Sequence, residues 1–306
     1  MSDGLRMGFV GVTTGSSSIM KVFPRWADAL GLPTRTLVGH DIAVGAPPQT
    51  YRDVVGAVKS DPSHLGALVT THKIRVFEAA GDEFDDLDEL ARTFGEISSI
   101  AKRGARLTGA AKDPVTVRLA LEDFLPADHF GRTGGAALVL GSGGSGCALS
   151  HQLGVRADRP SGIICTARSA ERLDHQRELH ARAGIDPAVM RYVQTAGPDE
   201  VDALLAQLPP SSLVVNATGM GKDVPGSPLT DAARFPENGV AWEFNYRGSL
   251  EFLHQARAQQ ATRGLLVEDG WRYFVHGWTQ VVADVFDIPM PPETVQKLAD
   301  IAADTR

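Results

Sequence analysis

Hydrophobic and polar positions along the early part of the chain follow two periods in turn. Short apolar runs of the kind that form buried strands lie at residues 7–13, 34–40 and 66–71. Between them, residues 17–31 and 51–60 carry apolar side chains at helical spacing. Strands that alternate with helices of this length indicate a largely parallel sheet that is covered by helices on both faces.

The alternation then gives way to a hairpin. A helical pair is predicted around residues 74–94, and two short strand-like runs follow at 98–104 and 105–111. These two runs meet at Gly104, where a glycine permits the tight turn of a hairpin. Asp113 precedes a proline and marks the start of a further helix, because proline is favoured at the first helical position.

A polar stretch at residues 126–135 interrupts both periods with proline and glycine, so we place a linker and a domain boundary there. Six strand-like runs follow, with helical segments between them, at residues 136–140, 162–167, 191–195, 212–218, 240–245 and 264–269. This rhythm is typical of a doubly wound domain of the Rossmann type, which binds a dinucleotide.

Two final helices are predicted at residues 271–286 and 292–303, beyond the last strand, and we expect them to return to the first domain. A chain of 306 residues is also too long for one compact core. The expected fold is therefore α/β with two domains. Residues 1–125 and 271–306 would form a substrate-binding domain, and residues 126–270 a Rossmann domain.

Charge and apolar content narrow the range of partners. The formal net charge is −7 and no dense block of Lys and Arg occurs, which argues against a nucleic-acid partner. No secretion signal and no membrane-spanning apolar run is found, so a cytoplasmic protein is expected. Cys147 and Cys165 are interpreted as small buried hydrophobic residues. No metal site is expected, and monomer and homodimer both stay open.

A glycine-rich loop directly follows the run at 136–140 and precedes a helical segment. Glycines in this position let the backbone turn tightly and approach a pyrophosphate, whose charge is met by N–H groups at the helix N-terminus. The context between a strand and a helix favours this interpretation over a flexible linker. The expected cofactor contacts are Gly141, Ser142, Gly143, Gly144 and Ser145.

The end of the next strand favours NADP over NAD. An Asp or Glu at this point would bind the ribose 2′-hydroxyl and repel a 2′-phosphate, but the strand ends at Ala167, Arg168 and Ser169. Arg168 offers a planar guanidinium to the phosphate, Ser169 a hydroxyl, and Arg172 a second positive charge. The alternative is that Arg168 only marks a solvated helix start.

An ordered series of motifs resembles the shikimate/quinate dehydrogenase family. The motifs are Ser16 to Ser18, VTTHK ending at Lys73, GAAKD ending at Asp113, the glycine loop, ARSAER from Ala167, VNATGMG at 215–221 and EDG at 268–270. The resemblance implies a substrate domain, an NADP domain and a returning C-terminal helix. It also implies the NADP-dependent interconversion of a ring alcohol and a ketone in a carboxylated cyclitol, within the shikimate pathway to aromatic amino acids.

Residue roles are implied by the same resemblance. It makes Lys73 and Asp113 the catalytic pair, and it has Ser16 and Ser18 hold a substrate carboxylate. The other expected substrate contacts are Thr71, Ser98 and Gln280, and the other expected cofactor contacts are Ala217, Thr218 and Gly270.

The chemistry of the pair is consistent with these roles. When a secondary alcohol is oxidised, its hydroxyl proton must go to a base within hydrogen-bond reach, and a partly buried lysine beside a carboxylate can serve. Simpler interpretations stay open: Lys73 could be an ordinary exposed lysine, Asp113 a helix N-cap, and Ser16 to Ser18 the cap of the first helix.

Several positions depart from the family pattern. Ser98 and Ser99 stand where the family has Asn-Thr, Ala111 and Lys112 where it has a second Asn-Thr, and Gly277 where it has a substrate-binding glutamine. Loss of amides that bind ring hydroxyls predicts an altered substrate pocket. Two alternatives therefore stay open. One is a protein that binds cofactor and ligand without turnover, and the other is a different two-domain NADP dehydrogenase, such as one acting on folates.

Overall fold

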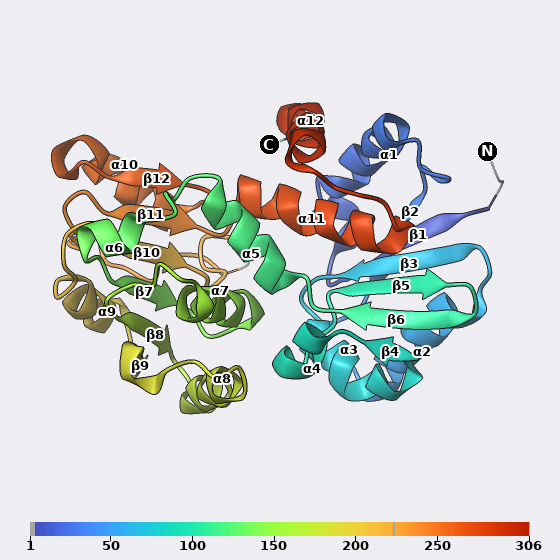
Figure 1. Cartoon of the computed structure of the whole chain (residues 1–306), viewed down its shortest axis with the longest axis horizontal. Helices are drawn as coiled ribbons and strands as arrows, with labels where there is room; N and C mark the ends of the chain where they lie inside the picture. Colours follow the sequence, from blue (N-terminus) through green and yellow to red (C-terminus); the bar gives the residue numbers. More distant parts are fainter. Residues whose placement is uncertain (1–3, 223, 306) are drawn as a thin grey trace. The chain divides into compact units, whose positions relative to one another are not determined.

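The structure, a computed structural model, describes residues 4–222 and 224–305. The chain forms two compact units, each with its own six-stranded sheet. The first unit comprises Met1–Thr116 and Val275–Arg306, and the second comprises Val117–Phe274. Figure 1 shows the elements of both units in sequence colours. The predicted α/β class is confirmed.

The sheet of the first unit has the strand order β2-β1-β3-β5-β6-β4. Its strands are β1 (Arg6–Gly11), β2 (Leu37–Asp41), β3 (His64–Val69), β4 (Asp86–Leu87), β5 (Ser99–Arg103) and β6 (Arg106–Ala110). β1 pairs in parallel with β2 and β3, whereas β5 runs antiparallel to both β3 and β6. The sheet is therefore more mixed than predicted, because the hairpin joins it directly. Gly104 turns this hairpin with φ +66, as predicted.

Helices cover both faces of this first sheet (Figure 1). They are α1 (Ile19–Leu30), α2 (Pro48–Ser60), α3 (Lys73–Ala80), α4 (Glu89–Phe94), α11 (Trp271–Phe286) and α12 (Pro292–Ala302), of which α11 begins in the second unit. Val10 and Val69 point to the face where α2 contributes Val55 to a buried apolar cluster. On the other face, the ring of Phe9 meets that of Trp278 from α11 at 4.9 Å. The alternating directions of side chains along β1 thus bury both faces.

The second unit carries an all-parallel sheet with the order β12-β11-β10-β7-β8-β9. The strands are β7 (Ala137–Leu140), β8 (Ile163–Ala167), β9 (Met190–Gln194), β10 (Leu213–Asn216), β11 (Val240–Glu243) and β12 (Leu266–Glu268). This is the doubly wound order in which a dinucleotide binds beyond the carboxyl ends of the strands, where the order reverses between β7 and β10. All six predicted strands are confirmed.

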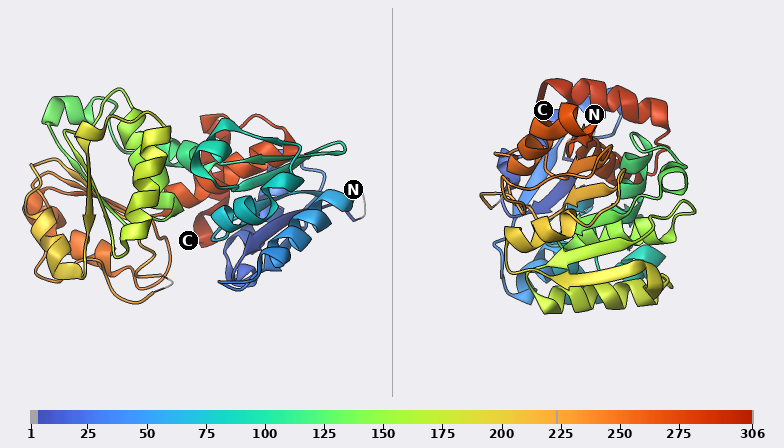
Figure 2. Two further views of the ribbon diagram at one scale, coloured as in Figure 1. Left: turned by 90° about the horizontal axis from the view of Figure 1, so that it is seen from below. Right: turned by 90° about the vertical axis from the view of Figure 1, so that its left-hand side faces the viewer.

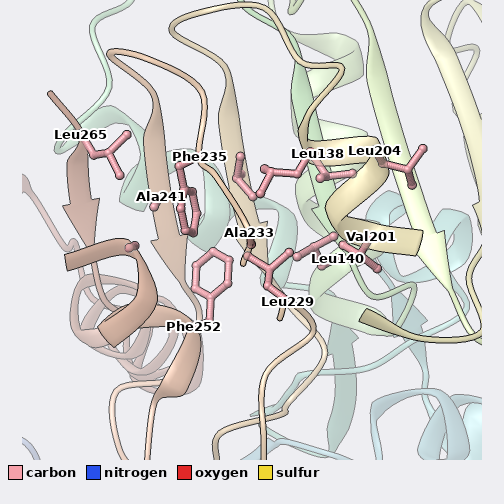
Figure 3. Packing of buried hydrophobic residues seen from close by; sticks show 13 residues of the cluster. Leu138, Leu140, Val201, Leu204, Leu229, Ala233, Phe235, Ala241, Phe252 and Leu265 are labelled. Atoms are coloured by element: carbon pink, nitrogen blue, oxygen red, sulfur yellow. The ribbon is translucent and has the colours of Figure 1, made fainter. Parts of the chain in front are cut away.

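The helices of the second unit lie on both faces of its sheet (Figure 2, left). They are α5 (Asp113–Glu122, which begins in the first unit), α6 (His129–Thr133), α7 (Gly144–Val155), α8 (Ala170–Arg182), α9 (Pro198–Leu205) and α10 (Glu251–Arg263). Figure 3 shows how Leu138 and Leu140 of β7 pack with Leu204 of α9 and Phe252 of α10. The ring of Phe252 meets that of Phe235 edge-on at 5.5 Å. This packing includes β7, from whose end the glycine-rich loop starts.

Two short elements were not predicted. The polar stretch 126–135 contains helix α6, whose first residues are held by Asp158, since its carboxylate accepts hydrogen bonds from the N–H groups of Phe130 and Gly131. The change from the first unit to the second falls earlier, between Thr116 and Val117 in α5. Strand β4, of two residues, lies inside the segment predicted as a helical pair. Within the described ranges, no helix has both the length and the apolar character required to cross a bilayer.

Candidate active site

The glycine loop of the second unit joins β7 to α7 and is built around two obligatory glycines. Gly141 has φ +103, and a Cβ placed on it would lie 2.7 Å from the carbonyl oxygen of Ala217. A Cβ on Gly146 would lie 1.9 Å from the carbonyl oxygen of Gly141. Gly143 is the N-cap residue of α7 and has no side chain to cap the first turn, so the N–H groups of that turn can meet an anion.

A cavity of about 800 Å³ lies beside this loop. The predicted cofactor residues that line it are Gly141, Ser142, Gly143, Ala167, Arg168, Ser169, Arg172, Ala217 and Thr218. Further lining residues were not predicted and include Thr195, Gly197, Pro198 and Val201 after β9, and Met220 and Pro228 after β10. The Gly197-Pro198 pair directly after a predicted strand was a usable signal for this wall.

Three predicted cofactor residues lie outside the lining of this cavity: Gly144, Ser145 and Gly270. The hydroxyl of Ser145 accepts a hydrogen bond from the Tyr273 hydroxyl at 3.3 Å. A Cβ on Gly270 would lie 2.1 Å from the carbonyl oxygen of Phe244, so close backbone packing accounts for this glycine.

Two exposed guanidinium groups border the cavity. Arg168 follows β8, and Arg172 lies in the first turn of α8. Neither forms an ion pair with any residue in the described part of the chain. Ser169 is the N-cap residue of α8 and accepts a hydrogen bond from the Arg172 N–H at 3.4 Å. The end of β8 therefore presents two unneutralised positive charges and a hydroxyl to the cavity.

A buried chain of hydrogen bonds supports Ser142 of the loop and was not predicted. The Ser142 hydroxyl donates to Gln176 Oε1 at 2.6 Å, and Gln176 Nε2 donates to the Ser150 hydroxyl at 2.8 Å. Ser150 hydrogen-bonds His180 Nε2 at 2.9 Å, and His180 Nδ1 hydrogen-bonds the Tyr192 hydroxyl at 2.7 Å. Burial, assisted by His151, lowers the pKa of His180 to about 4. These hydrogen-bonded side chains are therefore uncharged at neutral pH, and they hold the loop by polar contacts alone.

Lys73 and Asp113 form an ion pair in the first unit. Lys73 is the first residue of α3 and Asp113 the first residue of α5. The side chain of Lys73 is 19% exposed and that of Asp113 is 10% exposed. Lys73 is therefore not the ordinary exposed lysine of the simpler interpretation.

Backbone hydrogen bonds fix the surroundings of this pair. The carbonyl oxygen of Lys73 accepts from the Ile97 N–H at 3.1 Å. The hydroxyl of Ser98 accepts from the Lys112 N–H at 2.7 Å and donates to the Ala110 carbonyl at 3.3 Å. Ser98, a predicted substrate contact, is thus buried and joins the start of β5 to the end of β6. One acceptor position of its hydroxyl is left for a further partner.

A second carboxyl near the pair was missed by sequence reasoning. Glu96 is 1% exposed and lies between α4 and β5. Burial and the charge of Asp113 raise the pKa of Glu96, against the opposing effect of Lys73. Burial alone would lower the pKa of Lys73, but the charges of Asp113 and Glu96 and the hydrogen bond to Asp113 raise it. The only available signal was a single Glu in the otherwise uncharged run FGEISSI.

The remaining predicted substrate residues lie in the first unit. Ser16 and Ser18 follow β1 and Thr71 follows β3, so these residues share the carboxyl edge of two paired parallel strands. Ser18 is the N-cap residue of α1, yet its hydroxyl donates to the Thr305 carbonyl at 3.2 Å and makes no cap. Gln280 lies half-buried on α11.

The departures from the family pattern have structural consequences. Ser99 donates its hydroxyl proton to Asp284 Oδ2 at 2.6 Å, and Lys112 Nζ lies 3.6 Å from Asp284 Oδ1. Both residues thus interact with one carboxylate on α11. A Cβ on Gly277, also on α11, would lie 3.6 Å from Thr116 Cγ2, which is ordinary contact.

Comparisons with known proteins agree with this architecture. No protein-family model matches the chain. It is 30% identical to the shikimate dehydrogenase (NADP(+)) of Symbiobacterium thermophilum over 237 residues, 76% of this chain and 74% of that protein. The shikimate 5-dehydrogenase of Thermus thermophilus, solved with NADP(H) and shikimate, superimposes with a TM-score of 0.70 at 24% identity, covering 97% of this chain and 99% of that one. The quinate dehydrogenase of Corynebacterium glutamicum, solved with NAD, gives a TM-score of 0.75 at 18% identity, covering 98% and 99%.

A doubly wound sheet with a glycine loop after its first strand, joined to a second α/β unit, is typical of dinucleotide-dependent oxidoreductases. The chain belongs to the shikimate dehydrogenase family, as its motifs predicted.

Proposed function

We propose that the protein interconverts a ring hydroxyl and a ketone in a carboxylated cyclitol of the shikimate or quinate type, with Lys73 and Asp113 as the proton-transfer pair. The observation that carries this proposal is their partly buried ion pair at the starts of two helices. As a family member the chain is an NADP-dependent oxidoreductase that acts on a CH–OH group.

The residues of the second unit fit the pyrophosphate and the 2′-phosphate of NADP. Gly141 and Gly146 occupy positions where a Cβ would collide with backbone, which is the close packing that a nucleotide loop requires. Arg168 and Arg172 supply positive charge at the end of β8, where an acidic residue would select NAD. When bound, NADP supplies the acceptor for the hydride that leaves the alcohol carbon.

Lys73 moves the proton in both directions. During oxidation its neutral amino group accepts the hydroxyl proton, and the electron pair of the C–H bond leaves as hydride. During reduction its ammonium gives a proton to the carbonyl oxygen as alkoxide charge develops there. Because the pKa of Lys73 is raised, the ammonium predominates at neutral pH and favours the reductive direction. Asp113 holds the amino group in place through the ion pair.

Three of the proposed substrate contacts lie at the carboxyl edge of the paired strands β1 and β3. Ser16 and Ser18 would bind the substrate carboxylate, while Thr71, Ser98 and Gln280 would bind ring hydroxyls. Ser98 has one acceptor position to offer, and Gly277 has no side-chain amide to bind a ring hydroxyl. These changes favour a substrate related to shikimate but with a different pattern of ring substituents.

A substrate panel tests the proposal directly. The purified chain is mixed with NADP and with shikimate, quinate or an amino-substituted analogue, and NADPH formation is followed by its fluorescence. We expect turnover with at least one of these ring acids. Ligand and cofactor binding in calorimetry without turnover on any of them would indicate a binding protein. Tight binding of a folate would indicate a different two-domain dehydrogenase.

A further inference from the structure

We propose that Glu96 is a positioning residue for Lys73, a buried carboxyl that sets the pH range over which Lys73 takes up and releases its proton. This inference rests on the proposed role of Lys73 in the reaction. It concerns a residue that no motif of the chain had singled out.

The backbone holds Glu96 firmly beside the pair. Gly95 ends α4 with φ +64, and the Glu96 N–H donates to the Ala91 carbonyl at 3.4 Å. The next residue, Ile97, donates its N–H to the carbonyl oxygen of Lys73 at 3.1 Å. The backbone at Glu96 and Ile97 is therefore bonded to α4 and to α3, which fixes Glu96 next to the first residue of α3.

The side chain itself is buried and incompletely satisfied. Glu96 is 1% exposed, and its Oε1 atom has no hydrogen-bond partner in the part of the chain that the structure describes. An ionised carboxylate in such a place costs far more free energy than a neutral one. A carboxyl in such a place must either be protonated or have an interaction that offsets the cost of its charge.

Two carboxyls, Asp113 and Glu96, act on the Lys73 ammonium, and a third, Asp88, acts on Glu96. The charged groups that interact with Glu96 are Lys73 of α3, Asp113 of α5 and Asp88 at the start of α4. Asp113 forms the ion pair with Lys73, and Asp88 Oδ1 accepts from the N–H groups of Ala91 at 2.6 Å and Ala111 at 3.2 Å. Both aspartates thus have partners for their carboxylate oxygens. Glu96 lacks such support at Oε1, so it is the carboxyl that keeps its proton at neutral pH.

Ionisation of Glu96 changes the proton affinity of Lys73. As pH rises, Glu96 loses its proton and adds a second negative charge near the Lys73 ammonium. That charge stabilises the ammonium and delays formation of the neutral amine. The rate of reduction, which needs the ammonium, is therefore maintained at alkaline pH. The rate of oxidation, which needs the neutral amine, is lowered.

The variant Glu96→Gln separates this role from a structural one, because it keeps the shape and removes the titration. At about pH 6 the wild type and the variant carry the same charge, so their rates of NADP-dependent oxidation should agree within about twofold. At about pH 10 the variant should be about tenfold faster, since a unit charge some ångströms away shifts a pKa by about one unit. Glu96→Asp keeps a carboxyl, so the ratio of its oxidation rate to that of the wild type should return toward one.

The exposed Glu89 on α4 provides the matched control, and Glu89→Gln should leave the ratio at one throughout. A rate ratio for Glu96→Gln that stays constant from about pH 6 to pH 10 would overturn the inference. If Glu96→Gln does not fold, Glu96→Ala removes the same charge with a smaller side chain.

A measurement without turnover keeps the two proposals apart. The amino group of Lys73 is titrated by NMR in the full chain with isotopically labelled lysine, and its signal is assigned with Lys73→Arg. Glu96→Gln should lower the midpoint by about one pH unit. An unchanged midpoint refutes the role of Glu96. A shifted midpoint in a protein that turns over none of the ring acids refutes the proposed function instead.

Discussion

The Lys73 ammonium is ion-paired with the Asp113 carboxylate, although the two residues lie 40 positions apart in the chain. The sheet explains how they meet. β3 runs antiparallel to β5, and β5 runs antiparallel to β6, so β3 and β6 point the same way. Lys73 follows β3 and Asp113 follows β6, each at the start of a helix. The hairpin therefore returns the chain to the edge of the sheet where the lysine lies.

Cofactor preference should depend on Arg168. Replacing it with Ala removes a guanidinium that borders the cavity and forms no ion pair in the described part of the chain. We expect Arg168→Ala to weaken NADP binding by about tenfold or more and to leave NAD binding within about twofold. Calorimetric titration of both cofactors checks this. Arg191→Ala, at an exposed arginine of β9 outside the cavity, is the control, and equal losses for both cofactors would place the 2′-phosphate elsewhere.

Gly146 should tolerate no side chain. In Gly146→Ala the new Cβ would meet the carbonyl oxygen of Gly141 at 1.9 Å, so the loop must move away from α7. We expect a loss of about 1–3 kcal/mol in the free energy of unfolding, as for other overpacked sites, together with loss of NADP binding. Gly162→Ala meets nothing within 4 Å and should be nearly neutral in both measurements. Similar denaturant midpoints for the two variants would contradict the close packing.

The buried polar chain behind the loop should be needed for cofactor binding. Gln176→Leu leaves the Ser142 hydroxyl and the Ser150 hydroxyl each without one partner. The expected loss is about 1–3 kcal/mol of stability, because buried polar groups would be left unpaired, with weaker NADP binding as the loop loses its support. Glu178→Leu, at an exposed position of the same helix, should change neither quantity. Unaltered NADP affinity in Gln176→Leu would show that these buried hydrogen bonds do not support the loop.

His180 should make stability depend on pH. Its folded-state pKa is lowered to about 4 from an ordinary value of 6.5, so only the unfolded state binds a proton between these values. The stability that neutral His180 contributes is therefore present above pH 6.5 and is lost as pH falls toward 4. In urea unfolding, the stability advantage of the wild type over His180→Gln should shrink across this window by about 1.4 kcal/mol per pH unit. A constant difference between the two proteins would contradict a buried neutral histidine.

The parts of the fold that local sequence determines were predicted well. β7 and the loop after it were recognisable because an apolar run, tightly spaced glycines and a helix follow one another directly. The hairpin at Gly104 was recognisable for the same reason. Helix α6 and strand β4 were missed because elements of five and two residues are too short to show a period.

Site residues could be predicted from the sequence only where they belong to a recognisable motif. Lys73 and Asp113 came from the order of the family motifs, because nothing local distinguishes them from an exposed lysine and a helix cap. Glu96 and Gln176 were missed because the burial of a polar residue, and the partners it meets, depend on segments distant in the chain. The hydrogen bonds of Ser98 with the Ala110 carbonyl and the Lys112 N–H were likewise not predicted, because they form only when the two strands of the hairpin lie side by side.

The most direct test of the account is the rate of oxidation in Lys73→Met, measured with the best ring acid of the panel at saturating NADP. The variant loses the amino group that accepts the proton, so kcat/KM should fall by about a thousandfold, while the Kd for NADP, set by the second unit, stays within about twofold. Lys297→Met, at an exposed lysine, controls for the loss of a positive charge and should keep full activity. A Lys73→Met enzyme within about tenfold of the wild type would contradict proton transfer by Lys73.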